Sequence, residues 1–488
     1  MDDIVDAMHK HLLRSMVHKL KSKGAEYADI RWVRRRHENL SVLNQNAENI
    51  SSHIDEGYGI RVLYNGAWGF ACGSIFKEKE VEKNIKLAIS IARASSAINK
   101  DKVIFPACPA VHASHASSYQ TNPFEVSQDA KLHYLFYTNE ILMQSPQIKF
   151  AQSTLDFYHT GKFFINTEGS EIEQSFIESG GFFEVVACEG ARAQKRSYPI
   201  SHHSQIRQCG YEYIKELNFP ENAPRIREEA IMLLDARDAP IGETTIILDG
   251  YQTALQVHES CGHPVELDRV LGSELSYAGG SFLSLEKYGK FRYGSKLVNI
   301  SADATLAGGV GSFAYDDEGV KGQAIELVKN GVFSGYLSSR ETAGVIKKNS
   351  NGTMRAESWN HIPLIRMTNV NLEPQTPSFE ELISDTKEGL YLCTNKSWSI
   401  DDLRLNFQFG CEIAWQIKNG KLRQPYKNPV YYSNTPYFWN NCSGIANKDS
   451  WYLWGIPSCG KGEPAQSMHV GHAASPARFD KIMVGVRK

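Results

Sequence analysis

The sequence predicts an α+β protein: an N-terminal α/β domain with helices packed on a sheet, followed by a C-terminal β-rich domain resembling a barrel or sandwich. The chain has 488 residues, more than one hydrophobic core usually supports. Aromatic residues make up 11% of it, which favours strands. Apolar residues recur at helical spacing in the first half and alternate in many short stretches of the second.

The first half mixes both patterns. Apolar residues at helical spacing predict three long helices, at 3–24, 77–96 and 126–144. Residues 100–124, rich in proline, serine and histidine, are predicted to form a loop. Alternating stretches predict strands at 28–33, 41–43, 57–64, 67–71, 148–158, 162–167, 170–187 and 190–198. Two further helices are expected near 204–216 and from Pro224 to Asp235.

Beyond residue 240 the pattern changes to short strands and turns. Strand signals occur at 242–250, 298–301, 324–328 and 412–417, and the last two precede Asn-Gly turn signals. Many short strands of this kind predict a β-barrel or sandwich. We therefore divide the chain into an N-terminal α/β domain, residues 1–225, and a C-terminal β-rich domain, residues 226–488.

Composition excludes several classes of protein. The formal net charge is -2 and no long basic block occurs, which disfavours direct binding of nucleic acid. No apolar run is long enough to span a membrane, and the acidic N-terminus is unlike a signal peptide. Nine cysteines at irregular spacing do not form a disulfide framework. We expect a cytoplasmic protein with reduced thiols.

The most informative stretch is His258-Glu259-Ser260-Cys261-Gly262-His263. Imidazole is a preferred zinc ligand, and a carboxylate beside a metal can deprotonate its water. The two histidines are five residues apart, which on a regular α-helix separates them by roughly 140°. Both can reach one metal only if the helix widens, as in a π-bulge, or ends before His263. Glycine before His263 and proline after it are compatible with either arrangement.

A zinc site needs at least one further protein ligand. Cys459 lies in the glycine-rich stretch Cys459-Gly460-Lys461-Gly462, where the lysine would favour a thiolate. Two histidines and one cysteine would leave the fourth position open to water, as in catalytic sites. From spacing alone the alternatives stay open, and these are Glu266, His469, His472 and Cys261.

Several stretches together resemble the TldD/PmbA family of metalloproteases, also described as modulators of DNA gyrase. The resemblance is to the TldD type, which carries the HExxxH motif, and it covers nearly the whole chain. The matching stretches are Tyr27–Arg31, Gly57–Val62, Trp68–Ala71, the HExxxH segment, Asp316–Gly319, Pro363–Asn369 and Cys459–Lys461.

This resemblance implies a zinc site formed by His258, His263 and Cys459, with Glu259 as the general base. It also implies a C-terminal domain that carries the metal-binding helix. Members form two-fold dimers, often of TldD with a TldE (PmbA) subunit, whose active sites face an internal cavity. We therefore expect a homodimer, or a heterodimer with a TldE/PmbA-like subunit.

Two stretches depart from the family pattern. A glycine-rich turn is usual where this chain has Thr394–Ser399, which affects the shape of the peptide cleft. A proline-valine-glycine run is usual where this chain has His469–His472, which favours an additional ligand or proton donor near the metal. His469, His472, Arg355 and Arg366 are candidate donors to the oxyanion of the reaction. Asp316–Glu318 is expected to be a turn of solvated acids, with a second cation site as the alternative.

The function predicted is a zinc-dependent metallopeptidase that hydrolyses short or unfolded peptides, received as an added strand in a β-rich cleft. The first alternative is a non-catalytic partner protein that binds peptides or modulates gyrase. The intact histidine–glutamate–histidine set favours the enzyme, because a binding protein does not need a base beside a metal. A zinc amidohydrolase acting on small non-peptide amides is the second alternative.

Overall fold

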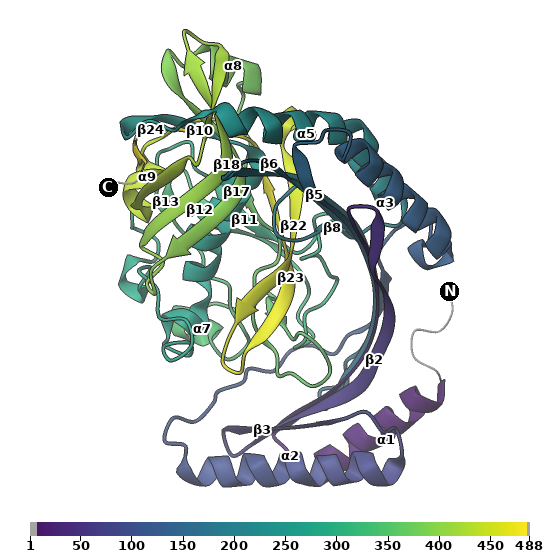
Figure 1. Cartoon of the computed structure of the whole chain (residues 1–488). Helices are drawn as coiled ribbons and strands as arrows, with labels where there is room; N and C mark the ends of the chain where they lie inside the picture. The colour runs from purple at the N-terminus through teal and green to yellow at the C-terminus, as the bar shows by residue number, and fades with distance from the viewer. Residues whose placement is uncertain (1–6, 486–488) are drawn as a thin grey trace.

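The computed structural model describes residues 7–485. It has two β-rich parts, and the second lies on the concave side of a curved sheet formed by the first (Figure 1). The first part is a long curved sheet in the strand order β3-β2-β1-β5-β6-β4, with β7 and β8 also paired to β6. All its pairings are antiparallel except that of β4 with β6. Its strands are β1 (Tyr27–Leu43), β2 (Asn46–Tyr64), β3 (Ala67–Gly73), β4 (His112–Ala116), β5 (Ile148–Asn166), β6 (Glu171–Glu189), β7 (Arg192–Tyr198) and β8 (Gln205–Arg207).

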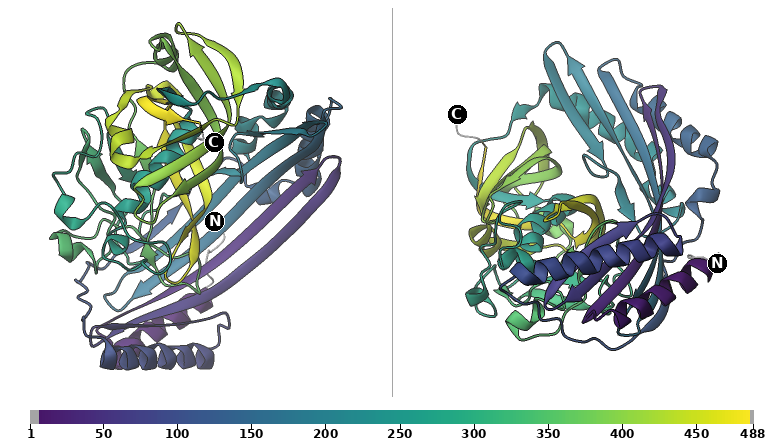
Figure 2. Two further views of the ribbon diagram at one scale, coloured as in Figure 1. Left: turned by 60° about the vertical axis from the view of Figure 1, so that its left-hand side comes forward. Right: turned by 90° about the horizontal axis from the view of Figure 1, so that it is seen from below.

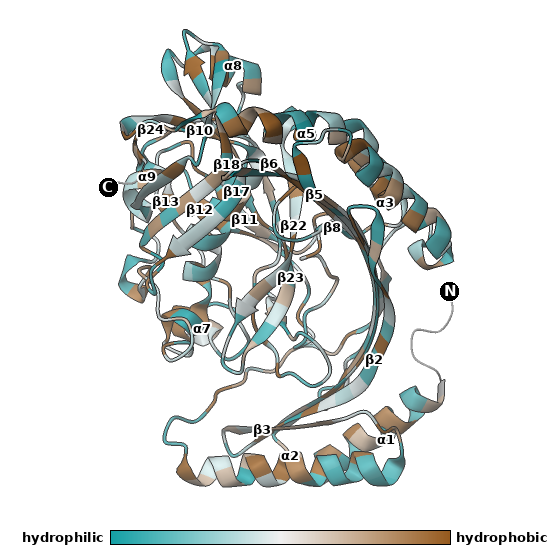
Figure 3. Cartoon of the chain, viewed as in Figure 1, coloured by the Kyte–Doolittle hydropathy of each residue, from teal (hydrophilic) through white to brown (hydrophobic). Residues whose placement is uncertain are grey.

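Helices cover the outer face of this sheet (Figure 2). Two of them pack on β1 to β3 at one end, and three pack on β5 and β6 at the other. Buried apolar side chains form both contacts. The helices are α1 (Ala7–Ser22), α2 (Glu78–Ile98), α3 (Gln128–Leu142), α4 (Glu212–Leu217) and α5 (Phe219–Asp235). Hydrophobic and hydrophilic residues alternate along helices such as α2 and α3 (Figure 3).

The second part is built around a five-stranded barrel. Its strands follow the order β17-β10-β24-β20-β18, and a further pairing of β17 with β18 closes the ring. The barrel strands are β10 (Gly242–Leu248), β17 (Glu388–Ile400), β18 (Asn406–Lys418), β20 (Val430–Asn434) and β24 (Ala477–Val484). Helix α6 (Gly250–Val257) follows β10, and its eight residues are all buried.

Smaller elements surround the barrel. The hairpin of β22 (Tyr452–Lys461) and β23 (Gln466–Ala474) is a separate two-stranded sheet that lies in the hollow of the curved sheet (Figure 1). The short helices are α7 (Leu267–Val270), α8 (Phe379–Ser384) and α9 (Thr435–Asn440). The other strands are β9 (Arg237–Asp238), β11 (Ile300–Asp303), β12 (Ala324–Lys329), β13 (Val332–Phe333), β14 (Met354–Arg355), β15 (Leu364–Ile365), β16 (Val370–Leu372), β19 (Leu422–Lys427) and β21 (Cys442–Ile445).

The predicted fold class is therefore confirmed, with differences in particular elements. The expected break at Thr160-Gly161 is absent, because both residues pair with β1 on one side and β6 on the other. The helix predicted near 204–216 is wrong over its first part, where residues 205–207 pair with β6 and α4 begins only at Glu212. The predicted loop at 100–124 contains β4. The division at 225/226 falls within α5 and stays a prediction.

The acidic stretch Asp316–Glu318 is not solvated, so that expectation is wrong. All three residues are at most 3% exposed. Lys162 of β5 donates to both oxygens of Asp317 at 3.0 Å, and Arg61 of β2 donates to Glu318 at 3.1 Å. Backbone N–H groups bind Asp316, and burial together with Glu318 raises its pKa to about 8. These acids join the barrel part to the curved sheet. Their oxygens bind protein donors, so the stretch is not arranged as a cation site.

Two further observations concern the whole of the described chain. Within residues 7–485 no helix combines the length and apolarity that crossing a membrane requires. All nine cysteines are unbridged.

Candidate metal centre

The helix that carries the HExxxH motif changes its winding within the motif. Asp249 caps α6 by accepting a hydrogen bond from the N–H of Gln252 at 2.6 Å. The helix then passes into a π-helical turn, His258–Gly262, and a 3-10 turn, His263–Val265. The N–H of His263 donates to the carbonyl of His258, the i→i+5 bond of a π-helix. The extra residue in this turn brings both imidazoles to one side, as their spacing predicts.

Glycine at position 262 is required by a close approach. A Cβ atom there would lie 2.1 Å from the sulfur of Met367. The methionine side chain therefore packs directly on the backbone of the widened turn. A larger residue would force the buried Met367 side chain or the turn itself to move.

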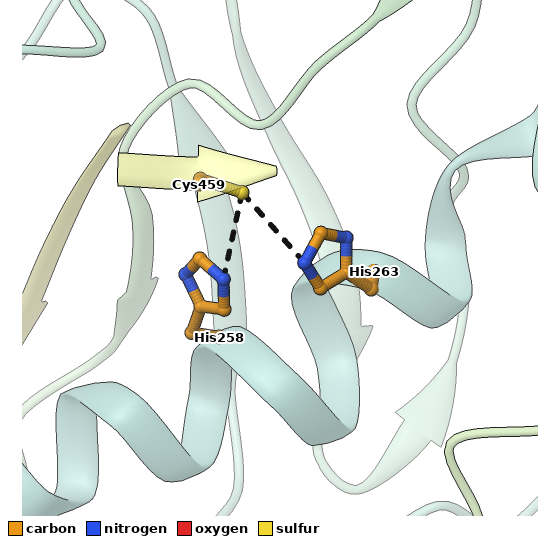
Figure 4. Close-up of side chains that lie close together, drawn as sticks. All are labelled: His258, His263 and Cys459. Carbon is orange, nitrogen blue, oxygen red and sulfur yellow. Dashed lines mark hydrogen bonds between the residues drawn. The ribbon is translucent and has the colours of Figure 1, made fainter. Parts of the chain in front are cut away.

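Three metal-ligating side chains converge above this turn: His258, His263 and Cys459 (Figure 4). The Cys459 sulfur lies 3.6 Å from Nε2 of His258 and 3.7 Å from Nε2 of His263. Zinc bonds of about 2.3 Å to sulfur and about 2.05 Å to nitrogen, at a tetrahedral angle, would separate these atoms by about 3.6 Å. The three side chains thus fit a tetrahedral metal with one position left for another ligand.

A hydrogen-bonded chain fixes the tautomer of His258. Nδ1 of His472 lies 2.9 Å from the carbonyl oxygen of Val370, which can only accept, so this nitrogen carries a proton. Burial and the neighbouring His258 hold the pKa of His472 well below its usual range, so its Nε2 is an acceptor. It accepts from Nδ1–H of His258 at 2.8 Å. The lone pair of His258 Nε2 therefore points at the metal position.

His263 is fixed in the same way by a carboxylate. Its Nδ1–H donates to Glu266 at 3.0 Å, which leaves Nε2 free to ligate. Glu266 is held in turn by Lys461, whose Nζ lies 3.3 Å away and also contacts Asp268 at 2.8 Å and Glu274 at 3.3 Å. Burial opposes the charge on Lys461, but these three acids raise its pKa above the usual value. Lys461 thus acts on Glu266 and not on the thiol, contrary to expectation.

The thiol of Cys459 is favoured as a thiolate by other groups. It is only 2% exposed, and burial alone would raise its pKa. His258, His263 and Arg366 outweigh that effect and bring the pKa of Cys459 well below its usual range. Without a metal the thiolate in turn raises the pKa of His258, although burial opposes this. A bound metal would replace the proton that these groups share.

Glu259 follows His258 but does not join the ligand cluster. Its Oε2 accepts a hydrogen bond from Nη1 of Arg404 at 2.5 Å. The carboxylate is therefore oriented by a cation, and its charge acts on His258, whose pKa it helps to raise against the effect of burial. Arg404 was missed by sequence reasoning, because nothing in the surrounding Asp401-Asp402-Leu403-Arg404 distinguishes it from a solvated turn.

The rival ligands lie elsewhere. His472 and Glu266 accept hydrogen bonds from the Nδ1 atoms of His258 and His263, not from the Nε2 atoms that face Cys459. Cys261 is packed in the hydrophobic core. His469 faces the curved sheet, where its Nδ1–H donates to Glu178 at 2.6 Å and its Nε2 accepts from Arg35 at 2.9 Å. Arg355 and Arg366 donate to backbone carbonyls, including those of His469 and Cys459. These contacts occupy donors of all four candidate oxyanion groups, although Nε of Arg366 is buried without a hydrogen-bond partner.

Comparison with known families agrees with this geometry. Residues 241–485 match the model of the PmbA/TldA metallopeptidase C-terminal domain, and residues 28–95 match domain 1 of the same family. The first match alone spans the barrel, the HExxxH helix and the hairpin with Cys459. The chain belongs to the PmbA/TldA metallopeptidase family. The resemblance stated from sequence motifs is thereby confirmed, and this metallopeptidase carries a group of side chains suited to a metal.

Individual relatives extend over most of the chain. A metalloprotease of Methanocaldococcus jannaschii is 32% identical over 412 residues, which cover 84% of this PmbA/TldA metallopeptidase and 87% of that protein. The zinc metalloprotease TldD homolog of Saccharolobus solfataricus is 26% identical over 473 residues, covering 96% and 98%.

Solved structures share the fold at lower identity. The crystal structure of TldE from Thermococcus kodakarensis superposes with a TM-score of 0.76 at 15% identity, covering 97% of this chain and 100% of that one. A structure from Thermotoga maritima, described as a candidate modulator of a DNA gyrase, gives 0.79 at 17% identity, covering 98% and 100%. These similarities establish the fold of the whole metallopeptidase chain.

Removing the His472 ring tests the hydrogen-bonded chain. His472→Ala leaves Nδ1–H of His258 without its acceptor and lets the ligand ring turn, so we expect metal affinity to fall about 10–100-fold. Competition with a fluorescent zinc chelator measures this. His469→Ala, three residues earlier on the same strand, is the matched control and should retain the affinity of the unmodified protein. Equal affinities in both variants would show that the chain does not support the metal.

Proposed function

We propose that this chain is a zinc-dependent peptidase that hydrolyses short or unfolded peptides. In this proposal His258, His263 and Cys459 hold the metal and Glu259 is the general base. The observation that carries it is the convergence of three ligand atoms at tetrahedral spacing beside an oriented carboxylate. Zinc is favoured over other metals because thiolate is a soft ligand, and a named zinc metalloprotease is among the relatives.

The chemistry follows from the positions of these groups. A bound zinc ion would lower the pKa of a water molecule and polarise the scissile carbonyl. Glu259 accepts a proton from the attacking water as its oxygen bonds to the carbonyl carbon. The same carboxyl group then gives that proton to the amide nitrogen as the C–N bond breaks. His472 and Glu266 keep both imidazoles in the tautomer that ligates.

Burial of the site supports small or unfolded substrates. His258, Glu259, His263 and Cys459 are at most 6% exposed, so the rigid surface of a folded protein cannot reach them. An extended chain is narrow enough, and the two-stranded sheet β22–β23 that presents Cys459 offers a strand beside which it can bind. We include in the proposal a dimer, formed with a second copy or with a TldE-like subunit, because a TldE structure has the same fold.

Metal removal tests the proposal. We expect dialysis against a chelator to abolish cleavage of an unstructured peptide, and one equivalent of zinc per chain to restore it. Cobalt substitution should give a thiolate-to-metal absorption band that is absent from Cys459→Ser, which reports ligation without any turnover. A folded protein that contains the sequence of the same peptide should resist cleavage.

The rival functions predict different results. A peptide-binding or gyrase-modulating partner protein would bind the peptide and leave it intact, whether or not zinc or a TldE-like subunit is present. An amidohydrolase of small compounds would cleave non-peptide amides and spare the peptide. Either result would overturn the peptidase assignment.

A further inference from the structure

Arg404 contacts the candidate base Glu259, and not all of its donors have a partner. Arg404 belongs to the turn that joins β17 to β18, and its side chain is 15% exposed. Its Nη1 donates to Glu259 at 2.5 Å. Its Nε is buried and has no hydrogen-bond partner among the residues that the structure describes. A guanidinium carries five N–H donors, so this one is arranged to bind a further acceptor.

The turn holds Arg404 in a defined place. Its backbone N–H donates to the carbonyl of Asp401 at 2.8 Å, and its carbonyl accepts from the hydroxyl of Thr435 at 3.0 Å. The Asp401 carboxylate also accepts from the N–H of Leu405 at 2.7 Å. Arg404 has φ of +60°, in the left-handed region that non-glycine residues seldom adopt. Such outliers gather at functional sites, where the surrounding structure fixes them.

We propose that Arg404 binds the carbonyl oxygen of the scissile amide and stabilises the negative charge that forms on it. This inference rests on the proposed peptidase function. His469, His472 and Arg355 donate to other groups. Arg366 also has a buried Nε without a partner, but its guanidinium donates to the carbonyl of Cys459, whereas that of Arg404 donates to Glu259. Arg404 is thus the arginine whose guanidinium both contacts the base and retains an unpaired donor beside it.

The step conserves atoms and charge. The water oxygen bonds to the carbonyl carbon, its proton passes to Glu259, and the π electron pair moves onto the carbonyl oxygen. Arg404 donates hydrogen bonds to that oxygen while it is negative. When the pair returns to re-form the carbonyl, the C–N bond breaks, and the nitrogen takes the proton from Glu259. Arg404 gives up no proton at any stage.

A tetrahedral anion provides the direct test. A peptide whose scissile amide is replaced by a phosphinate carries a charged oxygen where the oxyanion would form. We expect Arg404→Met to weaken phosphinate binding about 100-fold or more and to lower kcat/KM for the matching peptide by about 10²–10³-fold. Binding of the uncharged peptide and the metal content should change less than about threefold, because neither involves the developing charge.

Measurements in the Glu259→Gln variant separate direct contact of Arg404 with the oxyanion from an effect of Arg404 on the position of the base. Phosphinate binding is therefore also compared between Glu259→Gln and the double variant with Arg404→Met, where no carboxylate base remains to be positioned. A loss of about 100-fold there supports direct contact. Arg423→Met, on the exposed strand β19, is the matched control and should bind the phosphinate normally. Added guanidinium ion should partly restore the activity of Arg404→Ala.

The outcomes distinguish this inference from the peptidase proposal. If the unmodified protein binds the phosphinate through Arg404 but cleaves no peptide, the anion-binding role stands and the peptidase function fails. If the protein cleaves peptides and Arg404→Met binds the phosphinate normally in the Glu259→Gln background, the role of Arg404 is overturned. A protein that binds no phosphinate at all overturns it too.

Discussion

Replacing Glu259 with glutamine is expected to lower kcat for peptide cleavage by about 10³-fold and to leave the metal content unchanged. Glutamine matches the shape of glutamate and can still accept the hydrogen bond from Arg404, but it cannot take a proton from water. Loss of a positioned general base typically costs 10²–10⁴-fold. The metal should stay, because the three converging ligand atoms belong to His258, His263 and Cys459.

Two measurements are needed on the same preparations: metal per chain by mass spectrometry, and initial rates with an unstructured peptide. Glu243→Gln, on the barrel strand β10, removes a carboxylate away from the site and should retain full activity. A Glu259→Gln protein that cleaves at more than about a third of the normal rate would exclude this residue as the base.

The second large effect is expected from Lys461→Met. The Lys461 side chain is fully buried among Glu266, Asp268 and Glu274, and two of these carboxylates are fully buried themselves. Methionine keeps the length of the side chain but leaves their charges unbalanced, which for a buried group costs about 3–5 kcal/mol. In a domain of this size we expect the unfolding midpoint to fall by about 10 °C.

The midpoint should be measured on metal-free protein, since bound metal adds its own stability. Lys329→Met is the matched control: Lys329 pairs with Glu326 at 2.8 Å, but both side chains are more than half exposed. That exposed pair contributes less than about 1 kcal/mol to the free energy of unfolding. We also expect Lys461→Met to bind metal more weakly, because Glu266 loses the cation that holds it against His263. Similar midpoints for both variants would mean that the buried acids are neutral.

Local spacing predicted the core of the site and little of its surroundings. A spacing of five positions between two histidines, with glycine and proline around the second, required a widened or ending helix, and the π-turn is a property of that short segment. Placing Cys459 in the candidate site needed the family resemblance, since 201 residues separate it from His258 and no local pattern joins them. His472, Glu266 and Arg404 are recognisable only from contacts made after folding.

The same distinction applies to the fold. Alternating residues located most strands of the curved sheet but underestimated their length, because β1 and β5 are each paired on both sides and continue through residues of weak strand preference. Asp316–Glu318 looked solvated because three acids in a row usually are. Their partners Arg61 and Lys162 come from another part of the chain, so the burial of these charges depends on tertiary structure that propensity does not describe.

The order of the ligands along the chain affects how the enzyme is made. A ribosome adds about 5–20 residues per second, so the 201 residues between His258 and Cys459 take about 10–40 s to synthesise. During that interval the nascent chain has both imidazoles but lacks Cys459. The complete ligand set, and with it a reactive centre, first exists when nearly all of the barrel has left the ribosome. On the proposed ligand set, we therefore expect unfinished chains to lack a complete metal site.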